Sequence, residues 1–203
     1  MYKSFFKRIL DVIFGFLGLL AFAFSCVFVV PWIYFSDKGS VLYRAERLGK
    51  DGKPFKMYKF RSMYVDAPDI RNADGSTYNG EDDPRVTRVG KFLRRTSLDE
   101  IPQFINVFIG DMSLIGPRPD PLDDMEIYTP YQKRKLAVRP GITGYNQAFF
   151  RNSVEQNVKF DHDVYYVEHL SFALDVKIFI NTVIAVLLQK NIFNDVSKPD
   201  AAE

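Results

Sequence analysis

Cysteine is nearly absent from this sequence: among 203 residues only Cys26 carries a thiol. A single cysteine excludes an internal disulfide, and it fits a chain of the reducing cytosolic compartment. The sequence also lacks a Walker A motif, a G-x-G-x-x-G fingerprint, a His/Cys zinc spacing and an internal repeat. These absences argue against the P-loop and dinucleotide-binding classes, against a zinc domain and against a repeat architecture.

Acidic residues are scarce at the start of the chain. Residues 1 to 60 hold 10 Lys/Arg against 4 Asp/Glu, whereas residues 61 to 203 hold 17 against 21. The resulting charges of +6 and −4 sum to the net charge of +2. The basic surplus therefore surrounds the most apolar part of the chain, which favours a membrane with anionic lipids over nucleic acid as the partner.

The longest uncharged run is Val12 to Phe35, which is 24 residues long. This exceeds the ~18 residues needed to propose a bilayer span. Both flanks are basic, so the positive-inside rule does not decide which end crosses, and Pro31 can bend or break the helix. A cleaved signal peptide is disfavoured because the run continues well past its small-x-small step at Ala21 to Ala23. A spanning helix and a re-entrant helix that returns to the same face both remain open.

The rest of the chain predicts an α+β domain that is mostly helical. Alternating segments at residues 40–44 and 55–63, joined by the turn residues 49–54, predict an antiparallel β-hairpin. Apolar periodicity predicts short helices at 86–95 and 101–109, and the charged segment 123–135 predicts an outward-facing helix. The apolar segment 176–188 is too short to span a bilayer and favours a core or amphipathic interfacial helix.

Two adjacent carboxylates, Asp99 and Glu100, stand at a predicted helix start just after the basic run 91–95. One interpretation is a capping box, with Ser97 as N-cap and Glu100 as its partner. The other is a catalytic pair, in which arginines and the helix N-terminus keep a carboxylate ionised. Neighbours on a helix lie about 100° apart and cannot share one proton. If the pair is catalytic, one carboxylate attacks and the other holds a metal.

Several basic residues accompany this pair on stiff turns and on the second strand. Arg118 is locked between two prolines, and the turn at Arg139 supplies free backbone N–H groups for an oxyanion. The complete set of basic candidates is Lys59, Arg61, Arg94, Arg118, Arg139 and Arg151. So much positive charge around a carboxylate implies an anionic substrate, and a diphosphate with Mg²⁺ fits this best.

Two other acidic clusters are weaker candidates for a metal site. Residues 81–83 lie between a glycine and a proline and favour a solvated turn. Residues 161–163 are consecutive on a predicted helix, where side chains point apart.

Four motifs give the chain a resemblance to a known family. They are the residues 58–63 (YKFRSM), 97–103 (SLDEIPQ), 110–119 (GDMSLIGPRP) and 138–144 (VRPGITG). From residue 6 to about residue 188 the chain resembles the bacterial sugar transferases, the monotopic polyprenyl-phosphate phosphoglycosyl transferases in their small, catalytic-domain form.

The resemblance implies a reaction and a set of roles. A phospho-sugar passes from a UDP-sugar to undecaprenyl phosphate, and UMP is released. Asp99 is the implied nucleophile. Glu100 is implied to bind Mg²⁺ together with Asp99. Arg94 and Arg118 are the implied phosphate ligands, and Lys59 is a further basic position in the implied site. The implied location is the bacterial inner membrane, with the catalytic domain on its cytoplasmic face; a homodimer is left open.

The resemblance also implies a division of the chain. Residues 1–36 form a re-entrant membrane helix, residues 37–195 the catalytic domain and residues 196–203 a flexible tail. The family's helix breaks at a Ser-Pro step, which this sequence lacks, so we expect a break near Ser25 or Pro31, or a straighter helix. The alternative functions are a metal-dependent nucleotide-sugar glycosyltransferase that uses Asp82 and Asp83, and a non-catalytic membrane adaptor.

Overall fold

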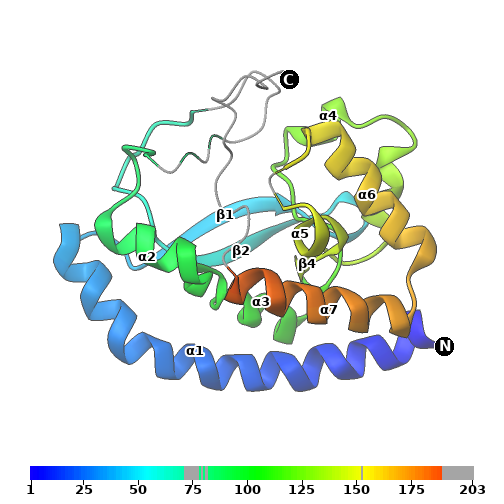
Figure 1. Cartoon of the computed structure of the whole chain (residues 1–203), viewed down its shortest axis with the longest axis horizontal. Coiled ribbons are helices and arrows are strands. Elements are labelled where there is room, and N and C mark those ends of the chain that lie inside the picture. Colours follow the sequence, from blue (N-terminus) through cyan, green and yellow to red (C-terminus); the bar gives the residue numbers. More distant parts are fainter. Residues whose placement is uncertain (71–77, 79, 81, 152, 189–203) are drawn as a thin grey trace.

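The computed structural model describes residues 1–70, 78, 80, 82–151 and 153–188, so the expected tail lies outside the described residues. Short helices and two small sheets lie above one long N-terminal helix (Figure 1). The helices are α1 (Lys7–Asp37), α2 (Arg88–Thr96), α3 (Gln103–Ile109), α4 (Asp124–Ile127), α5 (Tyr145–Phe149), α6 (Gln156–His169) and α7 (Phe172–Leu187). The strands are β1 (Leu42–Leu48), β2 (Pro54–Phe60), β3 (Ser113–Ile115) and β4 (Gly141–Thr143). The predicted mostly helical α+β fold is confirmed.

Helix α1 runs beneath the length of the domain and curves toward α2 at its C-terminal end (Figure 1). It is long and apolar enough to cross a membrane by length and composition. The expected break is not seen, because α1 is continuous through Ser25 and Pro31. The Ser25 hydroxyl donates to the Phe22 carbonyl at 2.8 Å, within the helix. A curve accommodates a proline, which has no N–H to donate, without ending the helix.

The N-terminal end of α1 is fastened to the domain by polar contacts. Lys7 Nζ lies 2.8 Å from Asp175 of α7, and Arg8 donates to the carbonyls of Val107 and Phe108 at the end of α3. The buried Asp11 accepts from the Ser113 hydroxyl and from a backbone N–H at the start of β3, both at 2.9 Å. These partners explain how a carboxylate is tolerated at the edge of an apolar helix.

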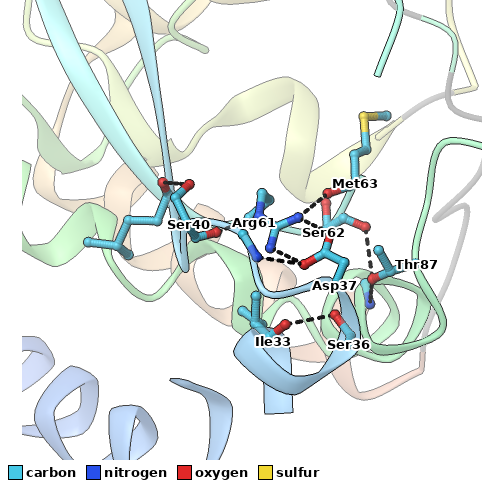
Figure 2. A network of polar contacts seen from close by, with 11 residues as sticks. Ile33, Ser36, Asp37, Ser40, Arg61, Ser62, Met63 and Thr87 are labelled. Carbon is cyan, nitrogen blue, oxygen red and sulfur yellow. Dashed lines mark hydrogen bonds and ion pairs between the residues drawn. The ribbon is translucent and has the colours of Figure 1, made fainter. Parts of the chain in front are cut away.

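The C-terminal end of α1 is fastened by Asp37. Its carboxylate pairs with the Arg61 guanidinium, which also donates to the carbonyls of Ser40 and Met63 (Figure 2). Since Arg61 directly follows β2, this ion pair joins the helix end to the hairpin.

The predicted antiparallel hairpin is confirmed, with Tyr43 of β1 opposite Lys59 of β2. Its turn uses positive φ at Asp51 (58°) and at Gly52 (73°), which agrees with the turn chemistry in the sequence. The parallel pair of β3 and β4 was not predicted, because strands of three residues carry too little periodicity.

The predicted outward helix at 123–135 is wrong in two respects. Helix α4 ends at Ile127, and after Pro130 the chain resumes as a 3₁₀ helix from Gln132 to Ala137. Lys135 faces inward, where it is buried between Asp120 and Asp163. The charged composition of this segment indicated solvent exposure, whereas part of its charge belongs to a buried ion cluster.

Helices α1 and α2 pack with β2 around one apolar core of Val29, Ile33, Phe60, Val89 and Leu93. The close approach of α2 to the chain after β2 depends on a glycine. A Cβ built on Gly90 would lie 1.8 Å from the Ser62 carbonyl oxygen. This contact helps to hold α2 close to β2, and α2 in turn positions the side chain of Arg94.

We predict that Gly90→Ala destabilises the protein. Helix propensity alone predicts a gain of about 1 kcal/mol for this change. The backbone contact with Ser62 opposes it, since a rigid carbonyl cannot move aside as a side chain can. Thermal unfolding in detergent should show a lower midpoint for the variant; a higher midpoint would contradict the close packing.

Candidate active site

A cavity of about 450 Å³ lies between the hairpin, the turn after α2 and the helices α5, α6 and α7. It collects residues that are far apart in the sequence. Six of the candidates named from the sequence line it: Lys59, Arg94, Asp99, Glu100, Arg118 and Arg151.

The acidic pair lies in a 3₁₀ turn, Leu98–Glu100, between α2 and α3. The capping-box interpretation is wrong, because Ser97 makes no side-chain cap bond and is instead the left-handed residue (φ 56°) that ends α2. The turn is closed by backbone bonds from Glu100 N to Ser97 O and from Ile101 N to Leu98 O, both 3.2 Å. The two carboxylates are therefore presented by a short rigid turn rather than by a helix N-terminus.

Burial raises the pKa of Asp99 to about 6. The Lys59 and Arg94 charges lower this pKa and the Glu100 charge raises it further, but burial is the largest effect. From the sequence, only the cations and a helix N-terminus were expected to act on Asp99, and both lower its pKa. Burial reverses the direction of this pKa shift. Asp99 is mainly ionised above about pH 6 and mainly protonated below it.

Glu100 is the stronger acid of the pair. Burial opposes its ionisation, but Lys59 Nζ donates to Glu100 Oε1 at 2.8 Å, and its charge and hydrogen bond lower the pKa of Glu100. Arg118 and Arg151 act in the same direction. The environment gives the two adjacent carboxylates different pKa values: Glu100 is held as an anion, whereas Asp99 titrates closer to neutral pH. Such a separation is common in acid and base sites.

Three of the four arginines that line the cavity were predicted from the sequence, and these three come from different elements. On α2, Arg94 Nε donates to the Ser62 hydroxyl at 2.9 Å. The backbone N–H of Arg118 donates to Asp163 of α6 at 3.4 Å, and Arg151 Nη1 donates to the Ala185 carbonyl of α7 at 3.4 Å. Three separate anchors thus direct guanidinium groups into one cavity.

Two basic residues that were predicted to bind phosphate, Arg61 and Arg139, instead make structural contacts. Arg61 is the ion-pair partner of Asp37 (Figure 2). Arg139 Nε donates to the Gly110 carbonyl at 2.7 Å and ties the turn before β4 to the end of α3. Both have clear structural contacts in place of the proposed phosphate contacts.

The acidic clusters also have structural partners. Asp83 forms a buried ion pair with Arg85 at 2.8 Å, and the side chain of Asp82 is 99% exposed. Asp163 pairs with Lys135 at 2.5 Å. Within the described part of the chain, no group of three or more His, Cys, Asp or Glu side chains could hold a metal ion.

Sequence reasoning missed four charged residues of this region: Arg47, Asp120, Lys135 and Asp163 as a cluster beside Arg118. Arg47 looked like an ordinary basic residue at the end of a strand. The Arg-Pro-Asp sequence at 118–120 was a usable signal, because a rigid loop that presents an arginine also fixes the carboxylate two residues later.

The apolar helix and the cationic cavity with its carboxylate pair define a membrane-associated protein with a site for an anionic ligand. A family model described as bacterial sugar transferase matches residues 2–189. The chain therefore belongs to the bacterial sugar transferase family, as the sequence motifs predicted.

Three relatives illustrate the range of the family. The chain is 43% identical over 192 residues to the galactosyl transferase CpsE of Streptococcus agalactiae, covering 90% of this chain and 42% of the relative. It is 38% identical over 186 residues to the uncharacterized sugar transferase EpsL of Bacillus subtilis, covering 92% and 89%. It is 38% identical over 197 residues to a UDP-glucose:undecaprenyl-phosphate glucose-1-phosphate transferase of Klebsiella pneumoniae, covering 93% and 41%. The chain thus spans about two fifths of the first and third relatives and most of the second.

We predict that Arg61 acts through the fold. The side chains of Arg61 and Asp37 are only 8% and 14% exposed, and removing one partner of a buried pair costs about 3–5 kcal/mol. Arg61→Gln should therefore lower the thermal midpoint strongly, and adding Asp37→Asn should restore part of the loss. A double variant no more stable than Arg61→Gln alone would contradict this coupling.

Proposed function

We propose that this protein transfers a phospho-sugar from a UDP-sugar to undecaprenyl phosphate and releases UMP. The observation that carries the proposal is the cavity itself, in which Asp99 lies beside Lys59, Arg94 and Glu100. Membership of the family supports the reaction, and the Klebsiella relative is named for a transfer of this kind.

In the first step, a carboxylate oxygen of Asp99 attacks the phosphorus that bears the sugar. The bond from this phosphorus to the bridging oxygen of the diphosphate breaks, and its electron pair leaves with UMP. The product is a sugar phosphate on Asp99. Because Asp99 titrates near pH 6, it is ionised and only weakly stabilised at neutral pH, which suits a nucleophile.

In the second step, a phosphate oxygen of undecaprenyl phosphate attacks the same phosphorus and displaces the Asp99 carboxylate. The overall reaction forms a polyprenyl diphosphate sugar and needs no net proton transfer. Lys59, Arg94 and Arg118 neutralise the phosphate oxygens, which is most of what phosphoryl transfer requires.

The carboxylate pair also fits Mg²⁺. This ion takes one or two protein carboxylates together with substrate phosphate oxygens, and Asp99 and Glu100 are two such ligands at the cavity wall. When bound, the ion would neutralise charge on the diphosphate. Lys59 remains the protein's own cation on Glu100, at 2.8 Å.

We further propose that α1 enters and leaves the same membrane face. One end is fastened to the domain at Lys7 and Arg8, and the other at Asp37. A helix held to one domain at both ends cannot place those ends on opposite sides of a bilayer that excludes the domain. Its exposed apolar residues, with those of α7, form the surface for the lipid. The proposed location is the cytoplasmic face of a bacterial inner membrane.

Asp99→Asn should abolish UMP release while the protein still folds and binds membranes. The amide keeps the shape of the carboxylate but cannot attack phosphorus. UMP would be measured with undecaprenyl phosphate and a panel of UDP-sugars, which also identifies the donor. Asp82→Asn is the matched control, because this exposed carboxylate lies away from the cavity and should leave activity unchanged. Full activity in Asp99→Asn would refute the role of Asp99.

Tags placed at residue 1 and at Lys53 in the exposed hairpin turn should both be accessible from the cytoplasm. The fastening of both ends of α1 to one domain gives this expectation. Labelling of intact cells and of inverted vesicles with a membrane-impermeant reagent measures the two positions. A periplasmic tag at residue 1 would show that α1 spans the bilayer.

A further inference from the structure

Arg47 stands at the end of β1 beside the rigid loop that carries Arg118. The backbone N–H of Leu48 donates to the Asp120 carbonyl at 2.9 Å, which fixes the end of β1 to the Arg118–Asp120 loop. Both arginine side chains line the cavity. Two guanidinium groups from separate elements therefore share one end of it.

Two of the acidic residues next to these arginines, Asp120 and Asp163, are engaged by a buried lysine. Lys135 Nζ pairs with the carboxylates of both Asp120 and Asp163, and the Tyr128 hydroxyl donates to Asp120 at 2.6 Å. Lys135 is only 2% exposed, so the lysine is buried behind the two carboxylates that line the cavity. The cluster holds the loop in place, and its lysine and tyrosine provide charge and hydrogen-bond partners for the carboxylates.

Arg47 and Arg118 both line the cavity, whereas Asp120 and Asp163 are already paired with Lys135. Burial lowers the pKa of Arg47 and the Arg118 charge adds to this effect, while Tyr43, Asp120 and Asp124 oppose it. Two like charges in a half-buried cavity repel each other, and a bound anion removes that penalty. Paired guanidinium groups match a phosphate group well.

The position of this end relative to Asp99 identifies the phosphate. Lys59, which contacts Glu100 of the carboxylate turn, lies opposite Tyr43 in the hairpin, whereas Arg47 lies opposite Phe55, four residues further along β1, which is about 13 Å of strand. Arg47 and Asp99 thus belong to different ends of the cavity. In phosphoryl transfer the leaving oxygen lies in line with the nucleophile and on the opposite side of phosphorus.

We propose that Arg47, together with Arg118, binds the phosphate of the nucleoside monophosphate that leaves when Asp99 attacks. This inference rests on the proposed function, and it assigns a specific ligand to Arg47, which lies outside the carboxylate turn. Arg47 would hold the donor before the reaction and the released UMP after it.

The test is equilibrium binding of UMP to the full-length protein in lipid nanodiscs, measured by calorimetry. Arg47→Met should weaken UMP binding about 10-fold or more, since a hydrogen-bonded charge is lost. Arg47→Lys should lose less, because it keeps the charge without the planar fork. Arg44→Met is the matched control, since Arg44 lies on the same strand but is exposed over the Tyr58 ring. It should bind UMP like the unmodified protein.

A kinetic measurement distinguishes the leaving phosphate from the acceptor phosphate. Arg47→Lys should raise KM for the UDP-sugar and leave KM for undecaprenyl phosphate unchanged. Unchanged UMP binding in Arg47→Met, or a raised KM for the acceptor alone, would overturn the assignment of Arg47 while leaving the proposed function intact. A failure of the unmodified protein to bind UMP at all would overturn both.

Discussion

The contact between Lys59 and Glu100 is the interaction on which the arrangement of the site depends. At 2.8 Å it joins β2 to the turn after α2, and it holds Glu100 as an anion despite burial. Burial raises the pKa of the neighbouring Asp99 to about 6; the Glu100 charge adds to this rise and the Lys59 charge opposes it. The hydrogen bond from Lys59 to Glu100 thus helps two adjacent carboxylates to differ in acidity, as the proposed reaction with one nucleophile and one supporting carboxylate requires.

The same hairpin links the site to the membrane helix. Lys59 is followed two residues later by Arg61, which pairs with Asp37 at the end of α1 (Figure 2). At its other end α1 is held through Lys7 and Asp175 to α7. The apolar helix α1 and the cavity are therefore parts of one packed unit, which agrees with the proposed transfer from a water-soluble donor to a lipid-borne acceptor.

The sequence was sufficient to predict the hairpin, α2, α3 and six charged residues that line the cavity, because periodicity and stiff Pro/Gly turns act locally. It was insufficient wherever long-range packing decides. The direction of the pKa shift of Asp99 depends on burial, and the inward position of Lys135 depends on two carboxylates distant in sequence. Arg61 and Arg139 resembled phosphate ligands because their partners, Asp37 and the Gly110 carbonyl, are brought close only by folding.

If Asp99 is the nucleophile, it forms a covalent bond to the transferred phospho-sugar. The most direct measurement is intact-protein and peptide mass spectrometry after incubation with the UDP-sugar and without undecaprenyl phosphate. The account predicts one phospho-sugar on the peptide that contains Asp99, with about one UMP released per protein molecule, and loss of the adduct when the acceptor is added. An unmodified peptide, with UMP released only when both substrates are present, would contradict the account and indicate direct transfer.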